Sequence, residues 1–299
     1  MDKQGARAEH GISPGSRRLG RIAAISLVPV FIYHAAVIVL PSLNTLVSSF
    51  TNWNGLARKD FLFLENYIEL VKDPNFAIAC MHNVVWMLYF LTIPLVLGFS
   101  GAYLLTKATR GRTVFKVGMF LPYVISAAIA GKIFAALFNP YFGINKVLEA
   151  IGLSVFARDW LAPSSSLASV AGVDIWHWWG FLMVLFISAF QQIDPMLYES
   201  AEIEGASEMQ KIRYITIPGI RQTLVFMILI TMVWSVNTFE YVWVMTKGGP
   251  GSELLSTMLY KNAFLKYRAG YACTIAVFQA FIAWIIFSIF ALIRKRMEE

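Results

Sequence analysis

Six long apolar stretches constrain this chain of 299 residues more than any other feature. Crossing about 30 Å of hydrocarbon takes roughly 20 helical residues. Lipid offers no hydrogen-bond partner to an open strand, and the alternating pattern of a membrane barrel is absent, so each stretch is expected to be a helix. The sequence therefore predicts an all-α integral membrane protein with six transmembrane helices, near residues 22–42, 84–106, 117–138, 167–190, 222–246 and 271–293.

Composition supports a membrane protein and excludes several other classes. Hydrophobic residues make up 58% of the chain and charged residues only 14%, against roughly 25% charged residues in a soluble domain. That leaves too little polar surface to cover a soluble globule. Cys80 and Cys273 are too few and too far apart for a disulfide framework or a thiolate metal cluster. The net charge of +7 does not indicate nucleic-acid binding, because no basic stripe alternates with aromatic residues.

The distribution of lysine and arginine predicts the orientation in the membrane. Fifteen of these residues fall in the N-terminal tail (1–21), the 107–116 loop, the 191–221 loop and the C-terminal tail (294–299), and nine fall in the loops on the other side. By the positive-inside rule, the richer side faces the cytoplasm. Both termini are therefore expected there, with residues 22–293 as the membrane domain. The first apolar run is too long for a cleavable signal.

The expected cytoplasmic loop over 191–221 is the most informative segment. Pro195 begins a short helix in it, and Gly205 permits a bend. Small residues would let another protein approach this helix closely: Ser200, Ala201, Gly205 and Ala206. The loop also carries five acidic residues: Asp194, Glu199, Glu202, Glu204 and Glu208. Composition alone leaves two interpretations open, a solvated amphipathic loop and a docking site for a partner protein.

The pattern of this loop resembles the EAA loop of ABC importer permeases. That loop has the form E-A-A, a short spacer, D-G-A, a longer spacer and I-x-L-P. The matching residues here are Glu199-Ser200-Ala201, Glu204-Gly205-Ala206 and Ile215-Thr216-Ile217-Pro218. Ser200, Glu204 and Ile217 replace the usual alanine, aspartate and leucine, and each replacement keeps size or charge.

Further motifs narrow the resemblance to maltose-type sugar permeases. The stretch from Phe239 to Pro250 is similar to the F-(D/N)-…-T-x-G-G-P ending of their fifth span, here Thr246-Lys247-Gly248-Gly249-Pro250. Their G-L-x-N-Y segment corresponds to Leu64-Glu65-Asn66-Tyr67, although Phe63 stands where glycine is usual. Two shorter segments also fit: Leu121-Pro122-Tyr123 and Phe138-Asn139-Pro140. The resemblance covers roughly residues 22–293.

The resemblance implies a type I ABC importer permease fold in the bacterial cytoplasmic (inner) membrane. It implies a second permease subunit, an ATPase dimer that docks on the 191–218 loop, and a periplasmic or extracellular solute-binding protein, with membrane lipid around the chain. ATP and Mg²⁺ would bind to the ATPase, and this chain would hold no cofactor, metal or catalytic residue. The chain lacks G-x-x-x-x-G-K-[ST], since isoleucine follows Gly131-Lys132. The expected ATPase-coupling residues are Glu199, Ser200, Ala201, Glu204, Gly205, Ala206 and Pro218.

Four ionisable residues lie inside the expected spans, and a charge at that depth costs at least about 2.5 kcal/mol, so each is a functional hypothesis. They are Lys132, Asp174, His177 and Glu240. Asp174 and His177 are three residues apart and share one helix face. Two interpretations of Lys132 stay open. It either pairs with Asp174 or Glu240 to hold helices together, or it faces the path and recognises an anionic group on a sugar.

Aromatic residues cluster beside His177: Trp176, Trp178, Trp179 and Phe181. Such residues either bind the faces of sugars or serve as lipid-belt and packing groups. Matching to the family motifs implies contact with sugar by Tyr123, Ala127, His177, Trp178, Phe181, Asn237 and Glu240. With Lys132 and Asp174, these residues form the expected substrate path.

Two other classes of function compete with this interpretation. An ion-coupled secondary transporter would use Asp174, His177 and Glu240 as a proton relay, but neither repeat symmetry nor interrupted helix pairs are evident. An intramembrane enzyme would use His177 and Asp174 as an acid–base pair, but it lacks a nucleophile or a metal-ligand set. Only the importer interpretation explains the EAA pattern. The sequence therefore favours a non-catalytic permease subunit of an ATP-driven importer for a sugar or sugar derivative.

Overall fold

The structure, a computed structural model, describes residues 25–56, 59–107 and 110–298, and these residues are almost entirely helical. The expected N-terminal tail over 1–21 lies outside them. Within these ranges, the β structure is one isolated antiparallel bridge between Thr51 and Phe61. In chain order the helices are η1 (Ala35–Val39), α2 (Leu40–Ser48), α3 (Glu65–Lys72), α4 (Pro74–Lys107), α5 (Arg112–Val124), α6 (Ala127–Leu137), α7 (Ile144–Ala150), η2 (Ser154–Phe156), α8 (Ser166–Phe190), α9 (Pro195–Ile203), α10 (Glu208–Lys211), η3 (Ile212–Thr216), α11 (Ile217–Gly219), α12 (Arg221–Asn237), α13 (Glu240–Thr246), α14 (Leu255–Tyr260), η4 (Lys261–Leu265) and α15 (Ala269–Glu298).

Five helical segments of the described chain are long and apolar enough to cross a membrane: Ile25–Ser48, Pro74–Lys107, Ser166–Phe190, Arg221–Thr246 and Ala269–Met297. A sixth crossing is present if the bent pair α5 and α6 forms one span. Each of these six units overlaps one of the apolar stretches in the sequence. The all-helical membrane architecture predicted from the sequence is therefore confirmed.

The third expected span, 117–138, is not one continuous helix. α5 and α6 meet at an angle of 92°, and the backbone between them leaves helical geometry at Ile125 and Ser126, whose ψ angles are 135° and 132°. Pro122 lies just before this break, where it removes one N–H from the hydrogen-bond ladder of the helix. Apolar patterning does not reveal the break, because most residues on both sides of it are hydrophobic.

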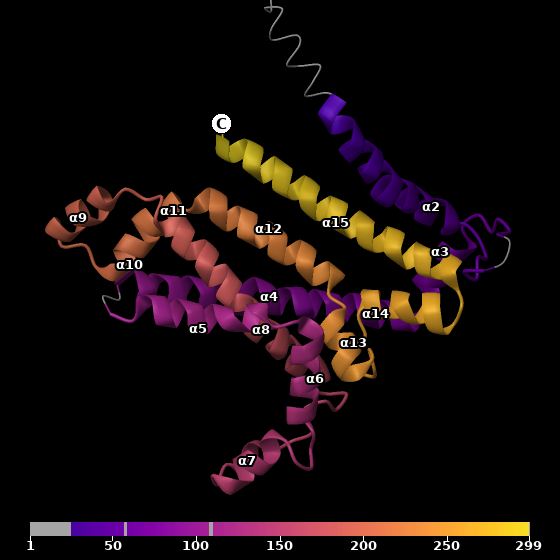
Figure 1. Ribbon diagram of the computed structural model, residues 1–299, viewed down its shortest axis with the longest axis horizontal. Helices are drawn as coiled ribbons and strands as arrows, with labels where there is room; N and C mark the ends of the chain where they lie inside the picture. The colour runs from indigo at the N-terminus through magenta and orange to yellow at the C-terminus, as the bar shows by residue number, and fades with distance from the viewer. Residues whose placement is uncertain (1–24, 57–58, 108–109, 299) are drawn as a thin grey trace, which may run out of the picture.

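The fifth span contains a second break. α12 ends at Asn237, Thr238 has a ψ of 130°, and α13 begins at Glu240. α13 packs against α6 and α8, so the segments that follow the two breaks lie next to each other (Figure 1). The apolar pattern predicted one uninterrupted span over residues 222–246, so it did not predict this break.

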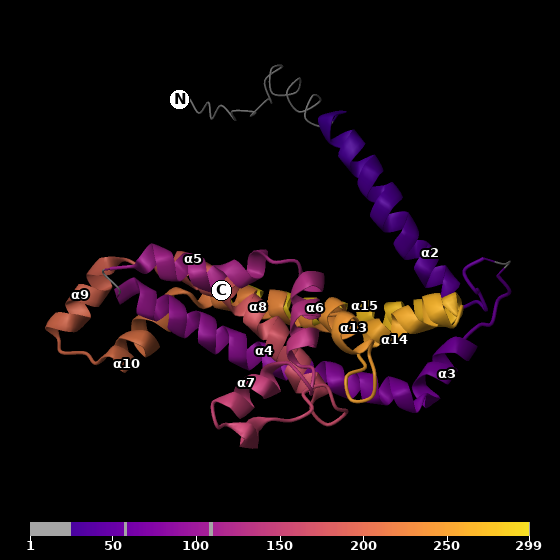
Figure 2. The same ribbon diagram turned by 60° about the horizontal axis from the view of Figure 1, so that its bottom comes forward.

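α8 is the central helix, and α4 and α5 pack along it (Figures 1 and 2). Most residues of α8 are buried, as expected for a helix that is apolar on all sides. Glycine permits a close approach of each of these helices to α8. A Cβ on Gly98 would lie 3.1 Å from the Cβ of Leu182, and a Cβ on Gly180 would lie 2.0 Å from the carbonyl oxygen of Met119. The main hydrophobic cluster surrounds α8 and takes buried residues from α4, α6, α12 and α13, with Tyr123 of α5 packed against it.

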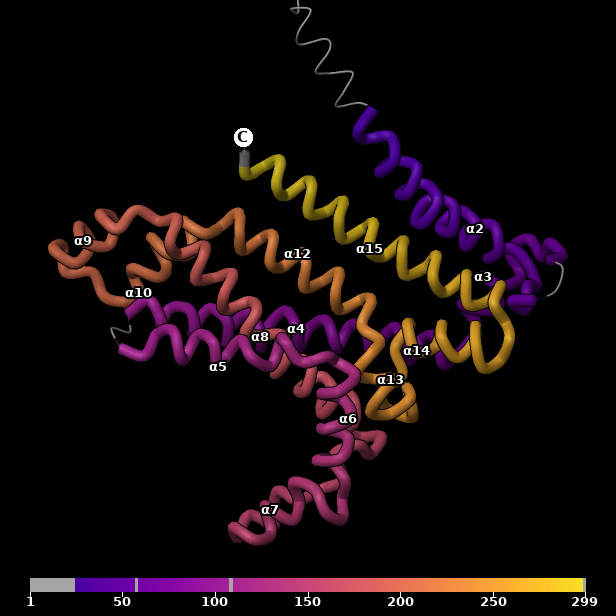
Figure 3. The backbone as a smooth tube through the Cα atoms, viewed as in Figure 1, coloured from indigo at the N-terminus to yellow at the C-terminus, as the bar shows by residue number. Residues whose placement is uncertain are grey.

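The helix over Ile25–Ser48 diverges from the other spans, as the tube in Figure 3 shows for α2. Its apolar length is unburied, and the chain is fixed where this helix ends. There the Asn66 side chain donates to the carbonyls of Ser49 and Thr51 at 2.8 and 2.9 Å, and the Tyr67 hydroxyl lies 2.8 Å from Ser49 Oγ. The Asn-Tyr part of the segment singled out in the sequence is thus the anchor of the first helix.

Candidate functional site

The loop over 191–221 forms one end of the long axis of the molecule, where α9 and α10 project beyond the spans (Figure 1). α9 begins as its sequence predicts. The side chain of Asp194 accepts a hydrogen bond of 2.9 Å from the N–H of Met196, and Pro195 occupies the first helical position. Both are favoured at helix starts, because the first N–H groups have no partner inside the helix.

Gly205 ends α9 and redirects the chain. Its φ angle is +73°, a conformation that residues with a Cβ rarely adopt. The N–H of Ala206 donates to the carbonyl of Ala201 at 2.9 Å, which closes the helix. Ser207 and Gln210 then form a reciprocal capping box that starts α10. No heavy atom lies within 4 Å of where a Cβ on Gly205 would stand, so the backbone conformation, not crowding, requires glycine here.

α9 is almost free of contacts with the rest of the protein. None of its residues is buried, and Ile203 is 88% exposed. A hydrogen bond of 2.9 Å between the hydroxyls of Tyr198 and Thr216 ties it to the return segment. Of the expected coupling residues, Ala201 and Ala206 are half-buried and the others are exposed: Glu199, Ser200, Glu204, Gly205 and Pro218. An exposed apolar tip next to acidic side chains has the character of a protein-docking surface.

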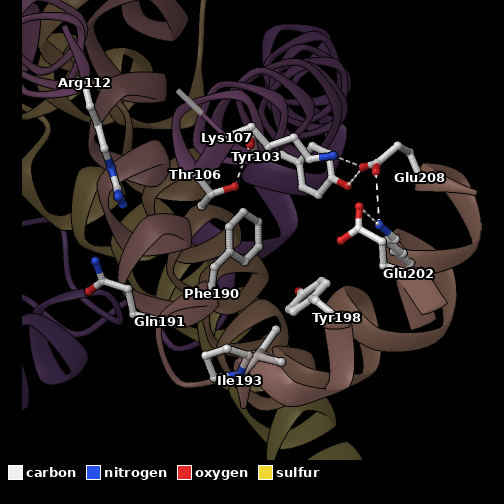
Figure 4. A pocket seen from close by; sticks show the side chains of 12 residues that line it. Tyr103, Thr106, Lys107, Arg112, Phe190, Gln191, Ile193, Tyr198, Glu202 and Glu208 are labelled. Atoms are coloured by element: carbon white, nitrogen blue, oxygen red, sulfur yellow. Dashed lines mark hydrogen bonds and ion pairs between the residues drawn. The ribbon is translucent and has the colours of Figure 1, made fainter. Parts of the chain in front are cut away.

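Behind α9 lies a cavity of 610 Å³ where α4 and α8 end and α5 begins (Figure 4). Its lining residues are Tyr103, Thr106, Lys107, Arg112, Phe190, Gln191, Ile193, Pro195, Tyr198, Glu202, Glu208 and Lys211. Within it, the carboxylate of Glu208 accepts hydrogen bonds from the Tyr103 hydroxyl and the Lys107 ammonium. The Lys211 ammonium lies 3.4 Å from Glu208 and 3.7 Å from Glu202.

Glu208 is held in its ionised form by these neighbours. The hydrogen bond from Lys107 is the largest cause that lowers the pKa of Glu208, followed by that from Tyr103, and together they bring it to about 2. A carboxylate with such a pKa stays charged at any physiological pH. Glu208 therefore supplies a negative charge to this group of side chains.

Four of the expected substrate-path residues come together between α5 and α8. The rings of Tyr123 and Phe181 stack with centroids 4.7 Å apart, and Tyr123 lies 5.5 Å from His177 and 5.9 Å from Trp178. His177 and Trp178 are buried, whereas Tyr123, Phe181 and the nearby Ala127 are half-buried. The four rings therefore pack mainly against one another, and only Tyr123 and Phe181 keep a substantial part of their surface exposed.

His177 has a structural contact that its sequence pattern did not predict. Its Nε2 lies 3.0 Å from the carbonyl oxygen of Ile125, at the break between α5 and α6. Because a carbonyl only accepts, Nε2 carries the proton in this contact, which leaves Nδ1 as an acceptor in the neutral ring. Nδ1 is buried and has no partner among the described residues. His177 therefore satisfies a backbone group that the break leaves unpaired.

The remaining path residues are more dispersed. Asp174 is fully buried, and neither of its carboxylate oxygens has a hydrogen-bond partner in the described part of the chain. Lys132, Asn237 and Glu240 are exposed. Among the described residues, no ion pair joins Lys132 to Asp174 or Glu240, so the structural pairing left open by the sequence is not formed in this structure.

The sequence did not predict several residues of the aromatic group or of the cavity behind α9. The Trp234 ring stacks on Trp178 at 4.8 Å, and Tyr241 lies 5.7 Å from His177. The residues that meet Glu208 and Glu202 were also missed, namely Tyr103, Lys107 and Lys211. Their one local signal is spacing, because residues 103 and 107 share a helix face and residues 208 and 211 do likewise. The contact between the two pairs depends on tertiary structure.

Comparisons with known proteins agree with this architecture. The family described as binding-protein-dependent transport system inner membrane component matches residues 95–299. The probable ABC transporter permease protein YurN of Bacillus subtilis is 33% identical over 266 residues, covering 85% of this chain and 89% of that protein. The multiple sugar-binding transport system permease protein MsmF of Streptococcus mutans is 28% identical over 283 residues, covering 93% of each.

A solved structure shares the fold. It is a crystal structure of a bacterial ABC transporter involved in the import of the acidic polysaccharide alginate, one chain of which superimposes with a TM-score of 0.85 at 21% identity and covers 95% of this chain and 99% of its own. Family members are permease subunits, which are not themselves catalytic. This chain belongs to the binding-protein-dependent transport system inner membrane component family, as a multi-pass permease subunit of an ABC importer.

Proposed function

We propose that this permease imports a sugar or a sugar derivative. The aromatic group of Tyr123, His177, Trp178 and Phe181 supports this substrate class, because stacked rings with a few polar atoms suit the apolar faces and hydroxyls of a sugar. The related Streptococcus mutans protein is named as a multiple-sugar permease, which points the same way. Asn237 and Glu240, exposed at the break between α12 and α13, would supply further hydrogen bonds.

In this proposal α9 is the element that receives force from a cytoplasmic ATPase dimer. The observation that supports this role most is the exposure of α9. None of its residues is buried, and leaving its apolar tip in water costs free energy unless a partner covers it. ATP and Mg²⁺ would bind to the ATPase subunits. The loop over 191–221 and both termini would then lie on the cytoplasmic side, as the lysine and arginine distribution predicts.

A second permease subunit and an external solute-binding protein complete the proposed complex. The unburied helix over Ile25–Ser48 and the open sides of α5 and α6 suit contact with another membrane subunit and lipid. The binding protein would deliver substrate at the opposite end from α9. ATP-dependent closure of the ATPase would shift the equilibrium between inward-open and outward-open states, since a ligand acts only through its different affinities for the two states.

Glu199→Lys tests the coupling role of α9. We expect the complex to assemble and to hydrolyse ATP while uptake per ATP falls by about tenfold, because the reversed charge opposes docking. The measurement is uptake and phosphate release in proteoliposomes that contain the ATPase, both permeases and the binding protein. The control is Glu149→Lys on α7, another exposed glutamate. Normal uptake by Glu199→Lys would contradict the docking role.

Lys132 offers a second test, this time of substrate charge. It is exposed on α6 and pairs with no acidic residue of the described chain, so we propose that it attracts an anionic group on the substrate. Lys132→Met should then lower uptake of an anionic sugar more than that of a neutral one. Lys146→Met on α7 serves as the control. Equal uptake of the anionic sugar by the Lys132→Met and native complexes would contradict the proposal that Lys132 attracts an anionic group.

A further inference from the structure

A network of five charged or polar side chains joins the end of α4 to the α9–α10 segment. We call it the Glu208 network; its members are Tyr103, Lys107, Glu202, Glu208 and Lys211 (Figure 4). Tyr103 and Lys107 are four residues apart and present one face of the last turn of α4. Glu202 belongs to α9 itself, while Glu208 and Lys211 belong to α10. The network therefore links a membrane span to the helix proposed to dock on the ATPase.

This network differs from an ordinary surface ion pair. An exposed ion pair contributes little to stability. The Lys211 side chain, however, is only 8% exposed, and a buried ammonium is costly unless anions face it. Glu208 lies between this buried charge and the two donors from α4. Loss of Glu208 would leave the Lys211 charge poorly compensated and would separate α4 from α10.

The opposite part of α4 contacts the break in the fifth span. Asn83 donates from Nδ2 to the carbonyl of Ser235 at 3.3 Å, and its Oδ1 accepts from the N–H of Leu255 at 2.9 Å. Asn83 and Lys107 are 24 residues apart, about 36 Å along a helix. A single helix thus has one end in the Glu208 network and its outer half at the break where α12 gives way to α13.

We propose that α4 is a second transmission element, which the Glu208 network couples to α9 and which carries its movement to the α12–α13 break. The covalent connections of α9 lead only to α8 and, through α10 and η3, to α12. The Glu208 network adds a direct link to α4. Glu208, Lys107 and Lys211 are then positioning residues for coupling. This inference rests on the proposed docking of α9.

A charge exchange in the complete reconstituted complex tests the link. Glu208→Lys should keep ATP hydrolysis but lower uptake per ATP by about fivefold or more, the range of a typical coupling free energy. The double variant Lys107→Glu with Glu208→Lys restores opposite charges between α4 and α10, so it should recover part of the uptake per ATP, although Lys211 still lacks the anion of Glu208. The matched control exchanges Lys146 and Glu149, a pair of similar exposure (61% and 47%, against 49% and 52% for Lys107 and Glu208) that lies within one helix.

A distance measurement separates this link from a merely structural effect. Spin labels at Thr106→Cys on α4 and Met209→Cys on α10, in a background without Cys80 and Cys273, should keep one separation with and without ATP. In Glu208→Lys that separation should change on ATP binding, and in the double variant it should again stay constant.

The outcomes distinguish this inference from the proposed function. If Glu208→Lys leaves uptake per ATP unchanged while Glu199→Lys lowers it, α9 docks but the Glu208 network does not transmit, and the inference is overturned. A separation between residues 106 and 209 that changes with ATP in the native complex overturns it as well. If both Glu199→Lys and Glu208→Lys leave uptake per ATP unchanged, the proposed docking of α9 is contradicted, and the inference that depends on it is overturned too.

Discussion

Backbone carbonyls at the two helix breaks are met by side-chain donors from other helices. His177 donates to the carbonyl of Ile125 at the first break. At the second break, Asn83 donates to Ser235, Gln279 donates to Val236 at 3.1 Å, and Ser256 donates to Thr238. An unpaired carbonyl inside a membrane protein costs several kcal/mol. These single residues therefore make it feasible for two spans to be interrupted in the interior.

His177→Phe should destabilise the protein, because it keeps a flat ring but removes the donor to Ile125. We expect a loss of about 1–3 kcal/mol, the cost of leaving a buried acceptor unpaired. His177→Gln retains an N–H donor and should lose less. Thermal unfolding of the purified permease in detergent measures both variants. Equal stability of His177→Phe and the native chain would show that the hydrogen bond to Ile125 is not important for the fold.

At the scale of helices, close packing against α8 determines how the break between α5 and α6 is oriented. α5 reaches α8 at Gly180, where a Cβ would lie 2.0 Å from the carbonyl of Met119. Backbone atoms cannot give way as a flexible side chain can. This contact sets the position of α5 immediately before its break, and so the place of Tyr123 against the aromatic side chains of α8.

Gly180→Ala should therefore disrupt the α5–α8 contact and reduce the yield of folded permease. Gly172→Ala in the same helix is the matched control, since no heavy atom lies within 4 Å of its Cβ position. Replacing that glycine should stabilise the helix by about 0.5–1 kcal/mol. Size-exclusion profiles and unfolding temperatures of the two variants provide the comparison. A Gly180→Ala variant as stable as Gly172→Ala would contradict the close approach of α5 to α8.

The link between α4 and α10 should withstand mild acid. The pKa of Glu208 is lowered from an ordinary value of 4.5 to about 2, so the contribution of its charge is present above pH 4.5 and is lost as pH falls through about 2. The separation of spin labels at residues 106 and 209 should be the same at pH 7 and pH 5. Lys107→Met removes the largest cause of this lowered pKa, so loosening should then begin at a higher pH than in the native protein. Loosening of the native protein at pH 5 would contradict this.

Sequence patterns predicted the membrane-spanning segments better than the breaks within two of them. The apolar stretches located every span because hydrophobic length is a local property. The EAA-like pattern similarly located α9 and its Gly205 turn. The breaks depend on donors such as Gln279 and Ser256, which come from distant helices, and no local pattern identifies them. The Glu208 network joins residues about 100 positions apart, so only the tertiary structure reveals it.

At the scale of the whole molecule, two functions are separated along the long axis. α9 and α10 occupy one end, and the α5–α6 and α12–α13 breaks lie farther along the bundle (Figure 1). The proposed mechanism needs communication between these regions and a partner at α9. If α9 is simply solvated, neither the proposed docking on the ATPase nor the proposed transmission through α4 holds.

Cross-linking at the tip of α9 tests this central claim most directly. Ile203, which is 88% exposed, is replaced by cysteine in a chain whose Cys80 and Cys273 have been substituted, and the transport-active complex is treated with a short thiol-reactive cross-linker. We expect Ile203→Cys to cross-link to the ATPase subunit. The control variant Val155→Cys, at a residue near α7 that is 84% exposed, should not cross-link. An active complex in which residue 203 reacts freely with a water-soluble thiol reagent and never cross-links to the ATPase would contradict the proposed docking.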